Sequence, residues 1–446
     1  MKPVPVIAIF DVGKTNKKLF LFDEQYNIVF ERSARFSEIK DEDGDPCENI
    51  DALRLSLFDS LNEVLGKKEF ILKAINFSAY GASFVYLDKE GNVLTPLYNY
   101  LKKYPGDIQK KFYDTYGGEF EFAHRTASPV LGSLNSGLQL YRVKYEKPAV
   151  FKRIHCALHL PQYLSFLLTG KVVSDITSIG CHTGLWDFTK NKYHEWVEKE
   201  GVEDKLAPIC PSSGVMDIVY QGHPFVSGIG LHDSSAALIP YLLNFKEPFV
   251  LISTGTWNIT LNPFNLTPLT DFELQHDCLS YMSFEGNPVK ASRLFAGYEH
   301  DEQLKLLASH FNKSLHFYKQ VSYDSAIIKD SYNRDEDSSN LIHFKNYEEA
   351  YHHFMFNLLK KELASSDLVM TENVKRIFVD GGFSGNTLFM NMLAALYPGK
   401  EVYAATMAQS TSLGAALAIH DKWNTNALPS GAIDLKYYTS DLRIKF

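Results

Sequence analysis

Short runs of hydrophobic residues alternate with polar turns along the chain, and the first such unit predicts a β-hairpin. Val6–Phe10 and Leu19–Phe22 are apolar runs of the kind found in buried strands, so the stretch Val6–Asp23 is expected to form strand, tight turn and strand. The pattern recurs at Phe249–Leu261, where a hydrophobic run leads into a turn containing Gly and Thr and then a second strand. Two similar hairpins in two halves of the chain predict two similar domains that face each other across a cleft.

Other segments predict a mixture of strands and helices, and hence an α/β fold. Further strands are predicted at Ile28–Phe36, Ile71–Ala79, Phe84–Leu87 and Val374–Asp380. Helices are predicted at Asp51–Leu65, Phe151–Leu168, Tyr347–Leu363 and Thr387–Tyr397. Residues 105–150 contain few strand signals, so we expect loops and helices there that cover the cleft.

Length and composition fit a globular protein of two domains. The chain of 446 residues is too long for one comfortable core, and its second half begins near Phe245, so we expect domains at residues 1–244 and 245–446. A net charge of −8 argues against nucleic acid or an anionic membrane as the main partner, because both require a basic face. A local basic pocket for ATP remains compatible with this charge.

The cysteines and the N-terminus favour a cytoplasmic protein. Five cysteines are scattered at positions 47, 156, 181, 210 and 278, which suggests reduced thiols. The apolar run after Lys2 is short, holds two prolines and ends at Asp11, so no signal peptide is expected. No run approaches the length of a membrane span, so no membrane partner is expected either.

The turn of the first hairpin carries groups suited to a polyphosphate. The segment from Asp11 to Lys18 combines a carboxylate, a glycine, hydroxyl and amide groups and three lysines. Backbone N–H groups, a hydroxyl and Lys can hold the phosphates, and Asp11 could face their metal ion. The alternative is a hairpin at the edge of a sheet with a basic surface turn.

A candidate general base lies at Asp233. In Val226–Leu238 a short strand ends at Gly230, and His232 and Asp233 open a helix. An Asp in this position can cap the helix, or accept a proton from a hydroxyl that attacks a phosphoryl group, and the two roles are compatible. The hydroxyl-rich segment Ser174–Trp186 is either a lining of the substrate site or a loop.

Paired glycines at a second strand-to-helix junction suit a nucleotide. Gly381 and Gly382 follow a predicted strand, and their bare backbone would let an adenine or a phosphate approach the next helix. The spacing of Gly381, Gly382 and Gly385 does not fit the dinucleotide fingerprint, which disfavours a dehydrogenase. A P-loop is also excluded, because Ala8 occupies its first Gly position.

Two patterns resemble metal sites but favour other interpretations. Asp41–Asp45 begins like a calcium loop, but Pro46 stands where such a loop requires Gly and no Glu closes it, so a solvated turn is expected. His155, Cys156 and His159 have metal-like spacing on a predicted helix, where packing is the more common role.

Together these pieces resemble the FGGY carbohydrate kinases. The phosphate hairpin of that family is similar to the segment from Asp11 to Lys18, and its second hairpin to Gly255-Thr256-Trp257. Its adenosine segment is similar to Gly381–Asn386, and a helix start to Thr411–Ala416. The motifs occur in the right order, and the resemblance covers essentially the whole chain. It implies two actin-like (ribonuclease H-like) domains with an active-site cleft between them.

The resemblance also implies roles for individual residues, with Asp233 as the catalytic base. The sugar would contact Gly81, Ala82, Ser83, His232, Asp233 and Ser234. ATP would contact Gly13, Lys14, Thr15, Asn16, Lys18, Gly255, Thr256, Gly381, Gly382, Ser384 and Asn386. Mg²⁺ would lie near Asp11 and Asp233. Lys14 and Phe383 depart from the family pattern, where a Thr and a Gly are usual.

Within the family, the chain most resembles the rhamnulokinase and fuculokinase branch, through His232-Asp233 and Tyr80–Phe84. This implies ATP-dependent phosphorylation of a 6-deoxy-ketohexose such as L-rhamnulose or L-fuculose at C1. A homodimer is a candidate for the oligomeric state. The alternatives are a kinase of another small ketose or polyol, such as xylulose, ribulose or erythrulose, an actin- or Hsp70-like ATPase, and a non-catalytic protein that binds sugar or nucleotide.

Overall fold

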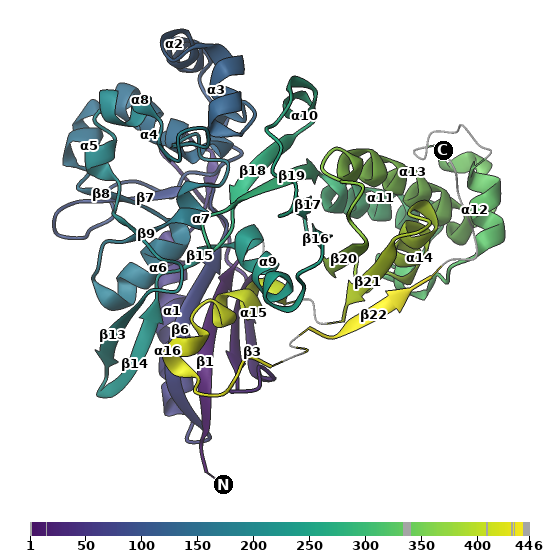
Figure 1. The fold of residues 1–446 in the computed structure, drawn as a ribbon, viewed down its shortest axis with the longest axis horizontal. Helices are drawn as coiled ribbons and strands as arrows, with labels where there is room; N and C mark the ends of the chain where they lie inside the picture. The colour runs from purple at the N-terminus through teal and green to yellow at the C-terminus, as the bar shows by residue number, and fades with distance from the viewer. Residues whose placement is uncertain are drawn as a thin grey trace.

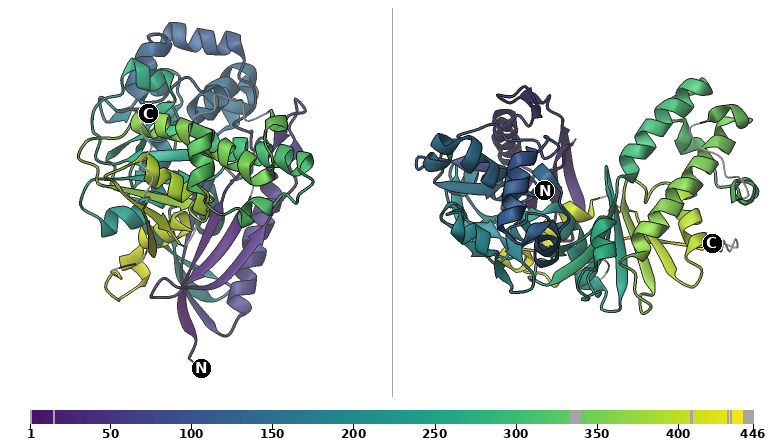
Figure 2. Two further views of the ribbon diagram at one scale, coloured as in Figure 1. Left: turned by 90° about the vertical axis from the view of Figure 1, so that its right-hand side faces the viewer. Right: turned by 90° about the horizontal axis from the view of Figure 1, so that it is seen from above.

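The computed structural model describes residues 2–14, 16–332, 340–406, 409–429, 431 and 433–439. It contains two seven-stranded sheets, one built from each half of the chain (Figure 1). Seen from above, the two lobes diverge from a common base (Figure 2). The predicted α/β architecture of two domains is confirmed. In the described part of the chain, no helix is both long and apolar enough to cross a membrane.

The first sheet is organised around the predicted N-terminal hairpin. Its strands are β1 (Val4–Val12), β2 (Lys17–Phe22), β3 (Ile28–Ala34), β6 (Phe70–Ala79), β13 (Val215–Tyr220), β14 (His223–Gly228) and β15 (Leu231–His232). Their order is β13-β14-β6-β1-β2-β3, and β15 also pairs with β6. β1 is antiparallel to β2 and parallel to β6.

The second sheet repeats this plan. Its strands are β16 (Phe249–Thr254), β17 (Asn258–Asn262), β18 (Cys278–Met282), β19 (Pro288–Leu294), β20 (Arg376–Gly381), β21 (Glu401–Ala405) and β22 (Leu435–Tyr438). Their order is β18-β19-β17-β16-β20-β21-β22. β16 is antiparallel to β17 and parallel to β20, as β1 is to β2 and β6. The two predicted hairpins therefore occupy equivalent places in the two sheets.

Short strands and helices complete the chain. The short strands are β4 (Ile39–Lys40), β5 (Pro46–Cys47), β7 (Phe84–Leu87), β8 (Cys156–His159), β9 (Ser174–Asp175), β10 (Trp186–Asp187), β11 (Lys192–Tyr193) and β12 (Ile209–Cys210). The first helices are α1 (Ile50–Gly66), α2 (Gly106–Thr115), α3 (Gly118–Thr126), α4 (Ser136–Glu146), α5 (Pro148–Arg153), α6 (Leu160–Thr169), α7 (Ile176–Ile179) and α8 (Glu195–Lys199). The later helices are α9 (Asp233–Asn244), α10 (Asp271–Gln275), α11 (Ala296–His310), α12 (Ser325–Tyr332), α13 (Tyr347–Asp367), α14 (Thr387–Leu396), α15 (Ser410–Leu417) and α16 (His420–Trp423).

Two helices cross between the sheets, and each helps to cover the sheet of the other half. α15, from the end of the chain, places Leu413 in one buried cluster with Ile7 and Ile9 of β1. α9, from the first half, places Leu238 in one cluster with Leu251 of β16. The sequence motifs do not reveal this exchange, because it depends on the packing of the two sheets.

The crossing point of α9 and α15 is a direct contact between backbones. A Cβ atom on Gly414 would lie 1.8 Å from the carbonyl oxygen of Ala236, so only glycine allows this approach. On the next residue, the carbonyl of Ala415 accepts a hydrogen bond of 2.8 Å from the buried amide of Asn76 on β6.

The helix predicted at Phe151–Leu168 is wrong in its first half. The segment divides into α5, β8 and α6, and β8 pairs antiparallel with β7. Periodicity cannot distinguish a short apolar strand from a buried helix, and here a distant strand decides. On β8, His159 stacks on Phe84 at 4.0 Å and hydrogen-bonds Ser136, so its role is packing. The predicted helices within residues 105–150 are confirmed as α2, α3 and α4.

The sequence predicts a solvated turn at Asp41–Asp45, but the structure shows that this turn is only partly solvated. Asp41 is buried, and the ammonium group of Lys102 lies 2.5 Å from Asp41 Oδ2, 2.6 Å from Asp43 Oδ2 and 3.2 Å from Asp45 Oδ2. A lysine therefore occupies the centre of a loop that begins like a calcium site. The charged, Ser-rich segment Ser331–Asn340, whose composition predicts a surface loop, lies mostly outside the described residues.

Candidate active site

A cleft of about 320 Å³ lies between the two sheets, and residues from both halves line it. The turn after β1, the turn after β16 and the start of α9 all open onto it. Of the residues predicted for the site, the lining includes Asp11, Gly13, Lys14, Gly81, Ala82, His232, Asp233, Ser234, Gly255 and Thr256. Most of the predicted residues are therefore brought together in one place.

The first turn is closed by its own backbone. The N–H of Gly13 donates to the carbonyl of Asn16 at 3.0 Å. The strand register places Lys18 opposite Asp11, but Lys18 and Asn16 do not line the cleft. Lys14 lines the cleft, and its ammonium group is 2.6 Å from Glu38. Thr15 lies outside the described residues.

A buried ion pair between Lys17 and Glu48 supports the turn that follows β1. Lys17 Nζ lies 2.7 Å from Glu48 Oε1, and the two side chains are only 6% and 4% exposed. The same ammonium group donates to the carbonyl of Lys14 at 3.0 Å. The other carboxylate oxygen of Glu48 accepts a bond of 3.5 Å from Tyr80, which lines the cleft. This pair therefore connects the shape of the first turn to the wall of the cleft.

The second turn is built in the same way. The N–H of Gly255 donates to the carbonyl of Trp257 at 3.0 Å. The first turn of α11 packs against it so closely that a Cβ atom on Gly297 would lie 1.8 Å from the carbonyl oxygen of Gly255. The contact with α11 fixes the position of Gly255 and Thr256 at the cleft.

The glycine segment, Gly381–Asn386 at the end of β20, adjoins the second turn but does not line the cleft of about 320 Å³. The N–H of Gly382 donates to the carbonyl of Thr254 at 2.9 Å. Gly381 has a φ of +84°, and a Cβ atom there would lie 1.9 Å from the same carbonyl oxygen. Ser384 donates to the carbonyl of Gly381, and Asn386 caps α14. These residues are held beside the cleft through Thr254.

Asp233 is the first residue of α9, at the seam between the halves. His232 is the N-cap position but makes no side-chain capping bond. Asp233 Oδ1 accepts a hydrogen bond of 2.7 Å from the N–H of Ser234. The Asp233 side chain is 34% exposed, so its carboxylate is accessible from the cleft.

Two further carboxylates lie at this seam, Asp11 close to Asp233 and Asp380 close to Asp11. Burial, and next the negative charge of Asp233, raise the pKa of Asp11 to about 7, against a weaker opposing effect of a hydrogen bond from Ser412. Burial also raises the pKa of Asp380 to about 6. Asp380, at the end of β20, was not among the predicted site residues, although it directly precedes the glycine segment.

These carboxylates fit a divalent cation. In the described part of the chain, no lysine or arginine forms an ion pair with Asp11, Asp233 or Asp380. The pKa of Asp11 is raised by burial and by repulsion from Asp233. A divalent cation that prefers oxygen ligands would offset both effects.

One part of the cleft near Asp233, called the pocket below, is lined by small and aromatic residues. Gly81 and Ala82 line it, whereas Ser83 is buried and donates to the carbonyl of Tyr98 at 2.8 Å. His232 is buried, with its ring 5.2 Å from that of Tyr281. Burial lowers the pKa of His232, so a neutral imidazole faces the pocket.

Family comparisons agree with this arrangement. Residues 6–239 match the N-terminal domain of the FGGY family of carbohydrate kinases, and residues 246–323 and 346–427 match the FGGY carbohydrate kinase C-terminal domain. The chain belongs to the FGGY family. The predicted resemblance is confirmed.

Curated relatives of this FGGY protein include rhamnulokinases. Those of Yersinia pestis and Mannheimia succiniciproducens are each 24% identical to it, over 60% and 59% of this chain and 56% and 55% of theirs. The match thus spans about half the length of these relatives.

Solved structures share the fold over almost the whole chain. A carbohydrate kinase from Novosphingobium aromaticivorans has a TM-score of 0.75 at 22% identity, covering 98% of this chain and 95% of that one. Xylulose kinase from Lactobacillus acidophilus has a TM-score of 0.78 at 16% identity, covering 98% and 94%. Plasmodium falciparum glycerol kinase has a TM-score of 0.75 at 16% identity, covering 99% and 95%.

The departure of this FGGY chain at Phe383 leaves the glycine segment accessible. The Phe383 side chain is buried and stacks on Phe389 at 4.7 Å, with His300 5.1 Å away. A Cβ atom on Gly382 or Gly385 would have no neighbour within 4 Å. Phe383 therefore points into the core and does not fill the space beside the two glycines.

Several cleft residues of this FGGY chain were missed by the sequence analysis. They are Tyr80, Tyr100, Leu134, His182, Ser253, Thr254, Trp257, Ile259, Tyr281, Arg293 and Thr411. Trp257 and Thr411 belong to recognised motifs, and His182 lies in Ser174–Trp186, which had been considered as a substrate lining. No motif indicates Tyr281 or Arg293, on β18 and β19.

Arg293 is the buried cation of the pocket wall. Its side chain is 4% exposed, and one guanidinium nitrogen lies 2.8 Å from Asp277 Oδ1. The guanidinium carbon is 5.0 Å from the ring centre of Trp257, and Nε has no hydrogen-bond partner among the residues that the structure describes. A hydroxyl of a bound sugar would offer such a partner.

Proposed function

We propose that the protein is an ATP-dependent carbohydrate kinase that phosphorylates a ketose, with a 6-deoxy-ketohexose such as L-rhamnulose or L-fuculose as substrate and C1 as the position phosphorylated. The observation that carries the proposal is the cleft itself, where Asp233 lies together with the two Gly-containing turns of the two sheets. Its chemistry suits transfer from a polyphosphate to an alcohol.

Asp233 acts as the base in this proposal. A sugar hydroxyl is too weak an acid to be deprotonated before attack, and in a loose phosphoryl-transfer transition state it need not be. Asp233 therefore orients the hydroxyl and accepts its proton late in the reaction. The hydrogen bond from the N–H of Ser234 holds the carboxylate in place for this role.

The two turns hold the phosphates. Lys14 supplies a positive charge at the cleft, and Gly13, Gly255 and Thr256 supply bare backbone and a hydroxyl there. The glycine segment at Gly381 and Gly382 offers a surface for the adenosine. Mg²⁺, held by Asp11 and Asp233, would supply charge neutralisation of the phosphates.

The pocket beyond Asp233 suits a small deoxy sugar. Gly81, His232 and Arg293 offer backbone, imidazole and guanidinium groups for hydroxyls, and Trp257 and Tyr281 line the cleft with apolar ring atoms that suit a methyl group. Rhamnulokinases among the curated relatives favour this substrate class.

The test is a coupled ADP-release assay on a panel of rhamnulose, fuculose, xylulose, ribulose, erythrulose and glycerol. We expect the highest kcat/KM with a 6-deoxy-ketohexose. Asp233→Asn should lower kcat by about 10²–10⁴-fold while ATP still binds, because a general base contributes about that factor. Asp217→Asn, at an exposed position on β13, is the matched control. Sugar binding without turnover by the wild-type protein would refute the proposal in favour of a non-catalytic sensor.

A further inference from the structure

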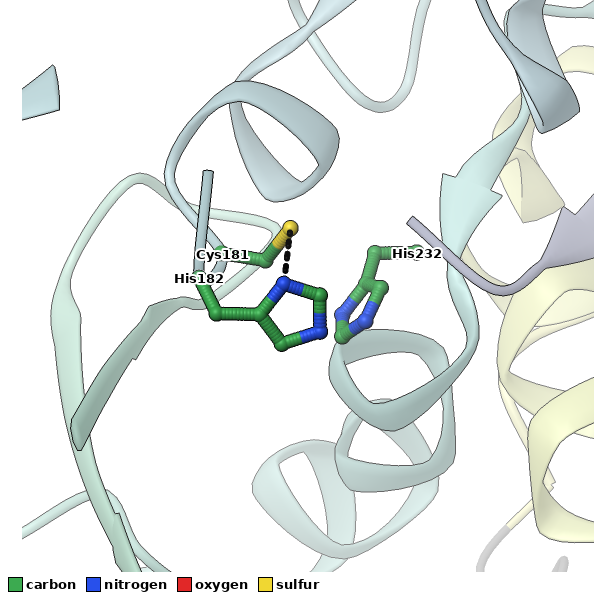
Figure 3. Close-up of side chains that lie close together, drawn as sticks. All are labelled: Cys181, His182 and His232. Carbon is green, nitrogen blue, oxygen red and sulfur yellow. Dashed lines mark hydrogen bonds between the residues drawn. The ribbon is translucent and has the colours of Figure 1, made fainter. Parts of the chain in front are cut away.

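A buried group of one thiol and two imidazoles lies at the cleft, which His182 and His232 line and behind which Cys181 is buried. Cys181 and His182 follow α7, and His232 ends β15 (Figure 3). The three side chains each offer one ligand atom, and these atoms lie within 4.8 Å of one another. The residues are only 1%, 7% and 2% exposed. Such residues gather in this way either as packing or as metal ligands.

The ligand atoms point toward a common space. Cys181 Sγ lies 3.9 Å from His182 Nδ1, the contact drawn in Figure 3. A Cβ atom on Gly81 would lie 2.9 Å from Cys181 Sγ and 3.5 Å from His232 Nε2, so these two atoms border the same gap beside Gly81. Glycine at position 81 leaves this gap open.

Contacts on both sides hold the ring of His232. Nδ1 lies 3.4 Å from Ser235 Oγ, which donates to the carbonyl of Met282 at 2.8 Å. Nε2 lies 3.2 Å from Asp233 Oδ1. When the proton of the neutral imidazole is on Nδ1, Nε2 presents a lone pair beside a carboxylate oxygen, and both atoms can bind a cation.

The position of His182 is also fixed. Its carbonyl accepts a hydrogen bond of 2.9 Å from the side-chain amide of Asn135. The positive charge nearby, on Arg293, is paired with Asp277 at 2.8 Å. The backbone therefore holds the imidazole at the gap, and the nearest guanidinium has its own counter-ion.

We propose that Cys181, His182 and His232 form a binding site for Zn²⁺ or a similar soft divalent cation, with a fourth position open to the cleft. One thiolate and two neutral imidazoles are ligands that zinc prefers, at about 2.3 Å for sulfur and about 2.0–2.1 Å for nitrogen. In a tetrahedral site these bond lengths place the ligand atoms about 3.4–3.6 Å apart, so atoms up to 4.8 Å apart must approach each other by up to about 1.4 Å when the metal binds. Binding forms the zinc–sulfur bond and releases the thiol proton to solvent.

The metal and the sugar exclude each other at this site. Zinc takes the lone pair of His232 Nε2 and fills the gap beside Gly81, and both residues belong to the proposed sugar pocket. It also places a second positive charge, besides the proposed Mg²⁺, beside Asp233, which makes that carboxylate a weaker proton acceptor. This second step rests on the proposed function, and it makes the site inhibitory.

The test of the site itself needs no turnover. Zn²⁺ is titrated into the full-length protein in competition with a chromogenic chelator. We expect one tight site per chain, with affinity lowered at least tenfold in Cys181→Ser and His182→Gln, since loss of even an indirect supporting group costs about 10–100-fold. Cys210→Ser, which changes the cysteine that is only partly buried, is the matched control and should bind as the wild type does. Equal zinc affinity in all four proteins would overturn the proposal.

A spectrum of the wild-type protein gives an answer even if Cys181→Ser fails to fold. Co²⁺ bound at the site should produce a sulfur-to-cobalt charge-transfer band and the strong visible bands of a tetrahedral complex. Absence of the charge-transfer band at saturating Co²⁺ would refute a thiolate ligand. In a separate experiment, the sugar that the panel identifies as the best ligand should weaken zinc binding in proportion to its concentration. Unchanged zinc affinity would overturn the exclusion of sugar by metal.

Discussion

Removal of Lys17 tests whether the buried ion pair shapes the nucleotide turn. Lys17 and Glu48 are 6% and 4% exposed, and the ammonium group bonds both Glu48 Oε1, at 2.7 Å, and the carbonyl of Lys14, at 3.0 Å. Lys17→Met leaves Glu48 as a buried charge without its partner. Loss of one partner of a buried pair costs about 3–5 kcal/mol, which is a factor of about 10²–10⁴ in the folding equilibrium.

A double-mutant cycle separates the cost of the unpaired charge on Glu48 from the loss of the hydrogen bond to the carbonyl of Lys14. Lys17→Met combined with Glu48→Gln removes both charges, so most of the stability should return. The hydrogen bond to the carbonyl of Lys14 stays lost, however, so ATP affinity should remain about tenfold lower in both variants. Urea unfolding measures the stability, and calorimetric titration with ATP and Mg²⁺ measures the affinity.

A surface pair provides the control for this cycle. Lys110 and Asp114 lie 2.6 Å apart but are 75% and 63% exposed, so Lys110→Met should change stability by less than about 0.5 kcal/mol. A cost below about 1 kcal/mol for Lys17→Met, or a double variant no more stable than the single one, would refute the argument from the unpaired charge. Full recovery of ATP affinity in the double variant would refute the role of Lys17 as an anchor of the turn.

Three further predictions follow from the site and the crossing helices. In Mg²⁺-free buffer, the pKa of Asp11 is about 7 in the folded chain and 3.8 in the unfolded chain, so the free energy of unfolding should fall as pH rises between these values. Asp11→Asn, measured by urea unfolding, should therefore gain more stability at pH 8 than at pH 4. An equal gain at both pH values would contradict this. Arg293→Leu should raise the KM for sugar by about tenfold or more and leave the KM for ATP unchanged, since one charged hydrogen-bond donor is lost; equal changes in both constants would indicate a structural role. Gly414→Ala should lower the free energy of unfolding by about 1–3 kcal/mol or more, because its Cβ atom meets a backbone oxygen at 1.8 Å, whereas Gly106→Ala, with no neighbour within 4 Å, should be nearly neutral.

The elements that the sequence predicted best are those with local signals. Val6–Phe10 and Leu19–Phe22 are strands because they are apolar runs on either side of a polar turn, and the equivalent hairpin at Phe249–Leu261 follows the same rule. Asp51–Leu65 is a helix in which Leu53, Leu57 and Leu61 share one buried face and whose first turn is capped by Asn49. The segment Phe151–Leu168 failed because pairing with β7, some 70 residues away, determines the conformation of its centre.

The residues of the candidate site likewise fall into those that have a local sequence signal and those that have none. Gly13, Gly255 and Gly381 were predictable because each follows a hydrophobic run that predicts a strand. Of the three, only Gly381 is in a conformation that favours glycine, with a φ of +84° and a backbone oxygen 1.9 Å from the position of a Cβ atom. Tyr281 and Arg293 were not, because a strand residue acquires its place in a pocket only when the sheet is assembled. The sequence indicated Cys181, His182 and His232 only separately, since 50 residues separate the last from the others. The roles assigned to all these residues stay predictions until the assays above are done.

The exchange of helices between the halves has a consequence for folding. Ile7 and Ile9 of the first strand are covered by α15, which is among the last elements to be synthesised, and Leu251 of the second sheet packs with α9, made earlier. A nascent first half therefore displays an uncovered apolar surface until the final helix arrives. The two halves should accordingly melt in one cooperative transition, and a gene fragment encoding either half alone should yield an aggregating product.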